Sequence, residues 1–208
     1  MYVVGLTGGI ASGKTEVATV FAGRGAEIVD ADEVARDVVR PGTPTWHKII
    51  EHFGDGVLGA DGELDRAALG RIVFSDPARR TLLNELTHPA VFAGIAERLE
   101  ALAPFDGVVV LSVPLLVETG QERACEAVVV VTTPRAAQVR RLVERRGLSP
   151  SEAEARVDAQ ADDQRRLAAA THVVRNEGTL RVLHERAGAV FDELEARARV
   201  VARRARRT

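Results

Sequence analysis

The segment Gly8–Thr15 has the sequence GGIASGKT, and this stretch decides the fold. The apolar run 2–7 (YVVGLT) precedes it, and the helix-forming run 14–21 (KTEVATVF) follows it. A strand, the spacing G-x-x-x-x-G-K-[ST] and a helix in this order are typical of a phosphate-binding P-loop. The sequence therefore predicts a nucleotide site at this loop, and a chance glycine-rich turn is the alternative.

Each residue type in the loop has a physical reason. Gly8, Gly9 and Gly13 allow backbone conformations and close approaches that a Cβ would block. The loop N–H groups and the N-terminus of the helix then attract an anion. Lys14 supplies a positive charge near the β- and γ-phosphates, and Thr15 offers a hydroxyl to Mg²⁺. Lys14 is one of only two lysines in the chain, which makes its place here hard to assign to chance.

The composition describes a chain of moderate size without an extreme charge. Its 208 residues are 46% hydrophobic and carry a formal net charge of −2. These values suit one domain with a lid or insertion and give no overall attraction to nucleic acid. Residues 197–208 hold six arginines and no acidic residue. We expect a solvated helix end there, with an acidic partner or an RNA contact as the alternative.

The single cysteine, Cys125, has no partner for an internal disulfide, which fits a reducing compartment. No stretch reaches the roughly 18–20 apolar residues of a membrane span. The first predicted strand begins at Tyr2 with no basic segment before it, so we expect no signal peptide. The sequence predicts a cytoplasmic protein that does not bind membranes.

Apolar, β-branched runs alternate with helical patterns along the chain. The runs are continuously hydrophobic, which favours strands buried on both faces of a parallel sheet. We predict an α/β fold of three layers around a five-stranded parallel sheet. The expected strands are 2–7, 26–29, 107–113, 127–132 and 171–174, and the expected helices are 14–24, 32–39, 43–53, 65–74, 76–103, 134–146, 150–170 and 179–204.

Ligands of such sheets bind at the carboxyl ends of the strands, so the residues after each strand are candidates. Asp30 and Asp32 follow the second strand. One of them, most simply Asp32, can cap the next helix. We favour Asp32 as the carboxylate that accepts the proton of an attacking hydroxyl. Asp30 is left open between a role near Mg²⁺ and a structural one.

The third strand is followed by SVPLLVE, residues 112–118, and no aspartate stands at its end. The apolar residues of this segment line a substrate pocket with Glu118 as a polar anchor, or they form an ordinary core-facing loop. The residues alone leave both readings open. Asn176 comes after the last strand, in a turn signal that is also a plausible place for a purine base.

Five arginines lie in the predicted helix 134–146, and four of them crowd its second half at 140, 141, 145 and 146. Most arginines here must be solvated or paired with acids four residues away. A P-loop kinase, however, needs a mobile lid that brings an arginine to the transferred phosphoryl group, and we favour Arg140. His88 precedes Pro89 inside the predicted helix 76–103, where proline forces a kink or a break.

Taken together, these segments resemble the dephospho-coenzyme A (CoA) kinase family along essentially the whole chain. The resemblance implies ATP-dependent phosphorylation of the ribose 3′-hydroxyl of dephospho-CoA, the last step of CoA biosynthesis. It also implies a P-loop core over 1–32, 106–134 and 171–208, a helical substrate-binding part over 33–105 and a lid over 135–170. The matching segments are 4–15, 29–36, 86–91, 113–118 and 173–178, with Arg140 and Gln160.

The resemblance also implies roles for single residues. Asp32 looks like the general base, and Lys14 and Arg140 look like the cations that handle phosphate. The expected ATP contacts are Gly8, Gly9, Ile10, Ala11, Ser12, Gly13, Lys14, Thr15, Glu16, Arg140 and Asn176, with Mg²⁺ at Thr15. The expected acceptor contacts are Thr7, Asp32, His88, Pro114, Leu115, Leu116, Glu118 and Gln160.

One position departs from the family pattern, because Thr171 stands where the family usually has aspartate. We expect the threonine hydroxyl to replace that carboxylate in part. We expect a monomer or weak homo-oligomer whose partner is the small-molecule acceptor and not nucleic acid. The rival functions are another small-molecule or nucleoside monophosphate kinase and, in a different class, a nucleotide-dependent switch or binding module.

Overall fold

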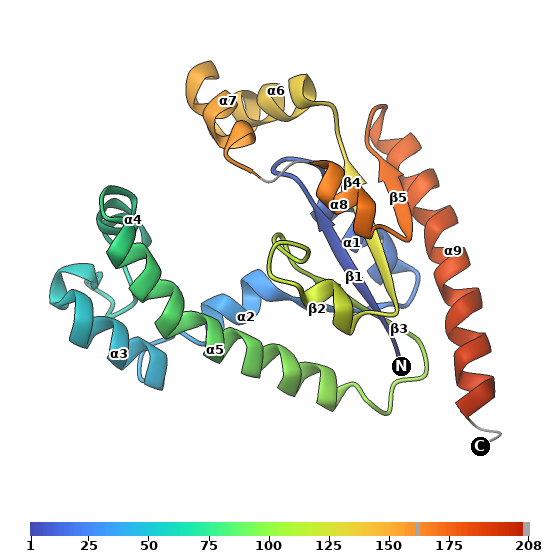
Figure 1. The fold of residues 1–208 in the computed structure, drawn as a ribbon, viewed down its shortest axis with the longest axis horizontal. Coiled ribbons are helices and arrows are strands. Elements are labelled where there is room, and N and C mark those ends of the chain that lie inside the picture. The colour runs from blue at the N-terminus through green and yellow to red at the C-terminus, as the bar shows by residue number, and fades with distance from the viewer. Residues whose placement is uncertain (161–162, 206–208) are drawn as a thin grey trace. The chain divides into compact units, whose positions relative to one another are not determined.

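A computed structural model describes residues 1–160 and 163–205 (Figure 1). The central sheet has five strands in the order β2-β3-β1-β4-β5. The first strand lies in the middle and pairs in parallel with β3 on one side and β4 on the other. The predicted α/β fold with a five-stranded parallel sheet is therefore confirmed. The strands are β1 Tyr2–Gly8, β2 Glu27–Asp30, β3 Val108–Ser112, β4 Ala127–Thr132 and β5 His172–Arg175.

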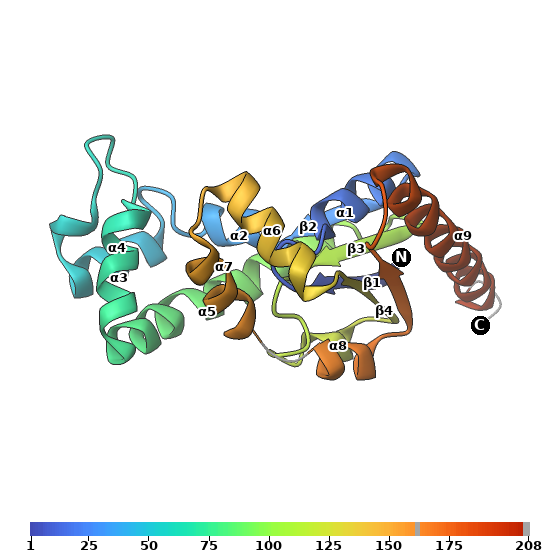
Figure 2. The same ribbon diagram turned by 90° about the horizontal axis from the view of Figure 1, so that it is seen from above.

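Helices cover both faces of this sheet. All seven residues of β1 are buried, as the continuous apolar pattern predicts for a central parallel strand. On one face, α1 (Lys14–Gly23) packs against α9 (Leu180–Ala205), and the Phe21 and Phe191 rings lie 5.4 Å apart. Figure 2 shows α8 (Asp163–Ala169) on the opposite face, where it contacts β4.

The chain divides into two compact units. One contains Met1–Val29 and Leu102–Thr208, and the other contains Asp30–Ala101. The second unit is helical and has its own small core around Ile49, Val57 and Leu69. Its helices are α2 Ala31–Asp37, α3 Pro44–Phe53, α4 Arg66–Ser75 and α5 Pro77–Ala101.

Of the kink or break predicted at His88, the break is wrong, because α5 continues through Pro89. Proline removes one helical hydrogen bond and costs about 3 kcal/mol in a helix interior. Packing offsets that cost, since α2, α3 and α4 all contact α5. Gly94 marks one close contact in this packing, because a Cβ there would lie 2.8 Å from Val34 Cγ1.

The single helix predicted over 150–170 is also wrong. After α6 (Arg135–Arg146), the structure has two helices, α7 (Pro150–Asp158) and α8. The first ends with turn hydrogen bonds from Ala159 and Gln160 to the preceding residues. Nothing in the local sequence breaks the helix, and contacts far along the chain determine where α8 lies.

Thr171 lies just before β5 and joins it to β4. Its hydroxyl accepts a hydrogen bond from Val128 N at 2.9 Å and lies 3.0 Å from Val128 O. The Thr171 hydroxyl therefore supplies a hydrogen-bond acceptor to the backbone of β4 at this position. Among the helices of residues 1–160 and 163–205, none is both long and apolar enough to cross a bilayer.

Candidate active site

The P-loop forms a concave turn between β1 and α1. Ala11 has φ 57° and Gly13 has φ 98°, so the backbone alternates into the left-handed region as an anion-binding nest requires. Of the described residues other than glycine, Ala11 alone has a positive φ. A Cβ on Gly13 would also collide with Asn176 Nδ2, so this position needs glycine for two reasons.

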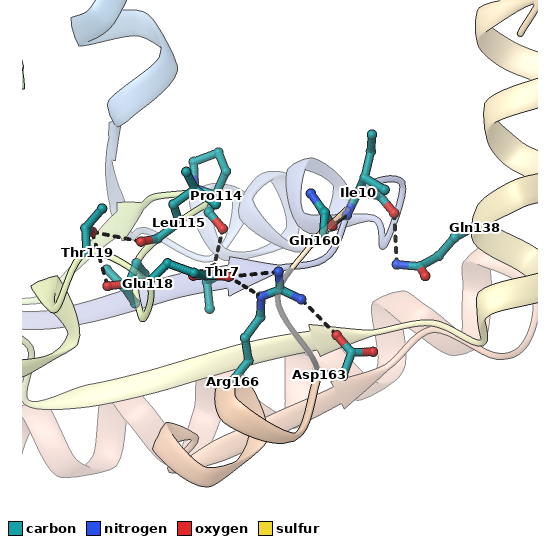
Figure 3. Close-up of polar contacts among 11 residues, drawn as sticks. Thr7, Ile10, Pro114, Leu115, Glu118, Thr119, Gln138, Gln160, Asp163 and Arg166 are labelled. Carbon is teal, nitrogen blue, oxygen red and sulfur yellow. Dashed lines mark hydrogen bonds and ion pairs between the residues drawn. The ribbon is translucent and has the colours of Figure 1, made fainter. Parts of the chain in front are cut away.

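Side chains from outside the loop hold its carbonyl groups. Gln138 Nε2 donates to Ile10 O at 3.0 Å, Arg141 Nη1 to Ala11 O at 2.9 Å, and Asn176 Nδ2 to Ser12 O at 2.7 Å. Gln160 Oε1 accepts from Ile10 N at 2.6 Å (Figure 3). Three successive carbonyls are therefore held by side chains from outside the loop, which fixes the shape of the loop.

Lys14 and the loop hydroxyls provide the polar groups of this turn. Lys14 Nζ donates to Ser112 Oγ at 2.6 Å, at the carboxyl end of β3. Ser12 Oγ is buried and has no hydrogen-bond partner within the described chain. Thr15 is exposed in the first turn of α1. An orphaned buried hydroxyl, a lysine and an open threonine suit a nucleotide phosphate.

The same residues fit Mg²⁺ as well. Kinases bind Mg²⁺ through one or two protein oxygens together with substrate phosphates and water. Thr15 offers one such oxygen, and the described residues contain no cluster of three or more His, Cys, Asp or Glu that would form a separate metal cage. Glu16, the neighbouring predicted ATP contact, instead pairs with His184 Nε2 of α9 at 2.6 Å.

Two adjacent arginines of α6 lie in different surroundings. Arg140, the predicted lid residue, has 66% of its side chain exposed and lies 3.9 Å from Glu144. Arg141 contacts the P-loop and also donates to Asn176 Oδ1 at 3.1 Å. Burial, followed by repulsion from neighbouring arginines, lowers the pKa of Arg141. Sequence reasoning missed Arg141, although its three-residue spacing from buried Gln138 places both on one helix face.

Polar contacts with other parts of the chain hold both ends of the predicted acceptor segment 114–118. Thr7 Oγ1 donates to Pro114 O at 3.0 Å, and Glu118 pairs with Arg166 of α8 (Figure 3). Between them, Leu115 is 49% exposed, whereas Leu116 is fully buried. A Cβ on Gly5 would collide with the Leu116 side chain, so this leucine is part of the core in the structure.

Asp30 and Asp32 belong to the helical unit and have separate roles at the start of α2. Asp30 is the N-cap, and its Oδ1 accepts from Asp32 N at 2.8 Å. The cap alternative for Asp32 is therefore wrong. The exposed Asp32 carboxylate makes no hydrogen bond or ion pair with the residues that the structure describes. His88 of α5 is exposed and lies 5.9 Å from the Phe92 ring.

The described geometry is that of a phosphate-binding loop with a lysine and an arginine-rich helix beside it. A comparison with protein families supplies the deciding observation, because the model of the family described as dephospho-CoA kinase matches residues 2–181. The chain belongs to the dephospho-CoA kinase family. This confirms the resemblance on which the site residues were predicted.

Relatives and solved structures agree with the family assignment. A dephospho-CoA kinase of Leifsonia xyli subsp. xyli is 47% identical over 193 residues, covering 92% of this chain and 98% of the relative. The structure of a dephospho-CoA kinase from Campylobacter jejuni matches with a TM-score of 0.73 and 26% identity, covering 93% of this chain and 97% of the other. A shikimate kinase from Acinetobacter baumannii matches with a TM-score of 0.53 and 15% identity, covering 95% of this chain and 94% of the other, which shows a shared fold only.

Membership in the dephospho-CoA kinase family makes the chain an enzyme, an ATP-dependent phosphotransferase. The rival classes of a nucleotide switch or a passive binding module receive no support from these relatives.

Proposed function

We propose that this chain transfers the γ-phosphoryl group of ATP to the ribose 3′-hydroxyl of dephospho-CoA, giving CoA and ADP. The observation that carries the proposal is the P-loop of a chain in this family, with its carbonyl groups held by Gln138, Arg141 and Asn176 and with Lys14 at its end. In the transfer, the hydroxyl oxygen forms a bond to the γ-phosphorus, the bond to the β-phosphate oxygen breaks, and ADP leaves.

We propose that the Asp32 carboxylate accepts the proton of the attacking hydroxyl. This role is supported by the start of α2, where Asp30 caps the helix and the Asp32 carboxylate is exposed. A carboxylate that is not used in a cap or an ion pair can accept a proton, and such general-base help contributes about 10²–10⁴-fold. His88 is proposed as an acceptor contact from the same unit.

The positive charges are proposed to act on the phosphates. The loop N–H groups and Lys14 bind the β- and γ-phosphates, and Arg140 approaches the γ-phosphate when the predicted lid 135–170 closes. Arg140 is exposed on α6, which is compatible with such a movement. Thr15 would hold Mg²⁺, which neutralises charge on the phosphates when it is bound.

We further propose that the enzyme acts in the cytoplasm as a monomer or weak homo-oligomer and does not bind nucleic acid. The single cysteine and the net charge of −2 support the compartment and the lack of nucleic-acid binding, respectively. Light scattering during gel filtration measures the oligomeric state directly.

The decisive experiment measures ADP release from ATP and Mg²⁺ with and without dephospho-CoA. We expect ADP only when the acceptor is present, with an equal amount of CoA formed. Shikimate, gluconate and nucleoside monophosphates serve as comparison acceptors. ADP release that depends on one of these and not on dephospho-CoA would overturn the proposal.

A further inference from the structure

Arg166 of α8 is a buried arginine that the proposed mechanism does not use. Its side chain is 2% exposed. Nε donates to Glu118 Oε1 at 3.0 Å, Nη2 lies 2.8 Å from the same oxygen, and Nη1 donates to Asp163 Oδ1 at 2.9 Å. Figure 3 shows the guanidinium between these two carboxylates. Glu118 lies 48 residues away in the sequence, so the pair joins two distant segments.

The polar atoms of this cluster are not all satisfied by the residues that the structure describes. Glu118 Oε2 is buried without a hydrogen-bond partner among residues 1–160 and 163–205, whereas Arg166 Nη2 is paired with Glu118 Oε1. Burying charges costs several kcal/mol per ion, and the attraction between them offsets this cost only when the remaining polar atoms are also satisfied. Apolar replacements of such a pair are often neutral or stabilising. A role in positioning therefore explains the pair better than a role in stability.

The pair holds the second end of the segment 114–118. The first end is held where Thr7 Oγ1 donates to Pro114 O. Leu115 projects into solvent between the two anchors. Apart from Arg166, the contacts of the described residues that hold this segment are the Thr7 hydrogen bond, local turn hydrogen bonds from Thr119, Gly120 and Gln121, and the burial of Leu116 in the core.

The guanidinium also lies beside the P-loop. A Cβ placed on Gly9 would be 3.6 Å from Arg166 Nη1. Gln160, two residues after the end of α7, accepts from the next residue of the loop, Ile10. Arg166 therefore lies where the P-loop, the segment 114–118 and the chain leaving α7 meet.

We propose that Arg166 is a positioning residue that fixes the segment 114–118 beside the P-loop through Glu118 and thereby sets the affinity for the acceptor. This inference rests on the proposed function, which makes the segment part of the acceptor site. Because Arg166 acts through Glu118, its effect falls on the acceptor and not on ATP.

The test compares steady-state kinetics of Arg166→Met, the double variant Arg166→Met/Glu118→Leu, and Arg165→Met. Arg165 is the adjacent arginine on α8, exposed to solvent, and serves as the matched control. We expect the KM for dephospho-CoA to rise at least ~10-fold in the first two variants, because small misplacements of a binding group have effects of this size. The KM for ATP should stay within about twofold of wild type in all three. Arg166→Lys should restore part of the acceptor affinity, since it keeps the charge but loses the planar fork.

Thermal unfolding separates this role from a structural one. Arg166→Met alone leaves a buried carboxylate unpaired and lowers the melting temperature. The double variant removes both charges, and we expect it to melt at or above the wild-type temperature while its acceptor KM remains high. A normal acceptor KM in the stable double variant would overturn the proposal, and so would a rise in the KM for ATP alone.

Failure of the proposed function is distinguished by the wild-type protein and not by the variants. In that case, the wild-type protein would release no ADP with dephospho-CoA. The same variants are then measured with the acceptor that the wild type does use. An unchanged KM for that acceptor would overturn the positioning role, and a selective rise would support it.

Discussion

Lys14 Nζ donates a hydrogen bond to Ser112 Oγ at 2.6 Å, which links the P-loop lysine to the last residue of β3. The two residues are 98 positions apart, and the parallel pairing of β1 with β3 brings them together. Ser112 is buried, so this contact holds the ammonium group at the carboxyl edge of the sheet. The hydrogen bond therefore fixes where the Lys14 ammonium group lies relative to β3.

Lys14→Ala should abolish turnover, with a loss of at least ~10³-fold in kcat, because it removes the charge closest to the transferred group. Lys48→Ala is the matched control, since Lys48 is the only other lysine and lies exposed on α3. Ser112→Ala should cause a smaller loss of about 10-fold, as expected for a hydrogen bond to a charged group. Equal activity of Lys14→Ala and Lys48→Ala would contradict the P-loop assignment.

Substitutions of Asp30 and Asp32 should have different effects, the first on the stability of the protein and the second on catalysis. Asp32→Ala should lower kcat at least ~100-fold, as expected for loss of a general base, with little change in the KM for ATP. Asp30→Ala removes the N-cap of α2 and should lower the free energy of unfolding by about 1 kcal/mol. Kinetics and urea unfolding of both variants check this pair. Near-normal turnover of Asp32→Ala would exclude it as the base.

The neighbours Arg140 and Arg141 should give different kinetic defects. Arg141→Met removes hydrogen bonds to Ala11 O and Asn176 Oδ1, so it should loosen the loop and raise the KM for ATP. Arg140→Met removes a cation proposed to act only during transfer, so it should lower kcat with little change in KM. Initial rates over a range of ATP concentrations distinguish the two. The reverse pattern would assign the lid function to Arg141.

The Cys125 thiol should react slowly in the folded protein. Burial, with repulsion from Glu126 and Glu122, raises the pKa of this thiol from its ordinary value of about 9 to about 11. Because the thiolate is the reactive form, alkylation at pH 8 should be far slower than in unfolded protein. The folded state keeps its proton while the unfolded state loses it, so this thiol stabilises the fold below pH 9, and the contribution declines as the pH rises toward 11. Mass spectrometry of iodoacetamide labelling measures the rate, with Cys125→Ala as the blank.

Much of the fold was predictable because its signals are local. Apolar runs predicted the five strands to within a few residues. The signal has a clear physical cause in β1, β3 and β4, because a strand buried on both faces requires apolar residues almost throughout. The break between α7 and α8 was not predictable in this way. Arg166, buried against Glu118, and Gln160, bound to Ile10, hold this segment through contacts with distant parts of the chain.

Some residues of the candidate site could likewise be predicted from local sequence patterns, and others could not. The residues Gly8–Thr15 and Asp32 were identified from spacing and from their place after a strand. The roles of Arg141, Ser112 and Arg166 appear only in the folded chain, because each depends on a partner more than 40 residues away. Only the geometry of α2 resolved which aspartate caps the helix.

The sequence by itself determined a P-loop kinase fold around a parallel sheet and the family to which the chain belongs. Backbone conformation and strand burial depend on neighbouring residues, so a local pattern is enough to predict them. Tertiary structure alone decided which of two adjacent arginines faces the loop, where Lys14 is held and which carboxylate pairs with buried Arg166. These pairings depend on how distant elements pack, and a charged side chain carries no local signal of its partner.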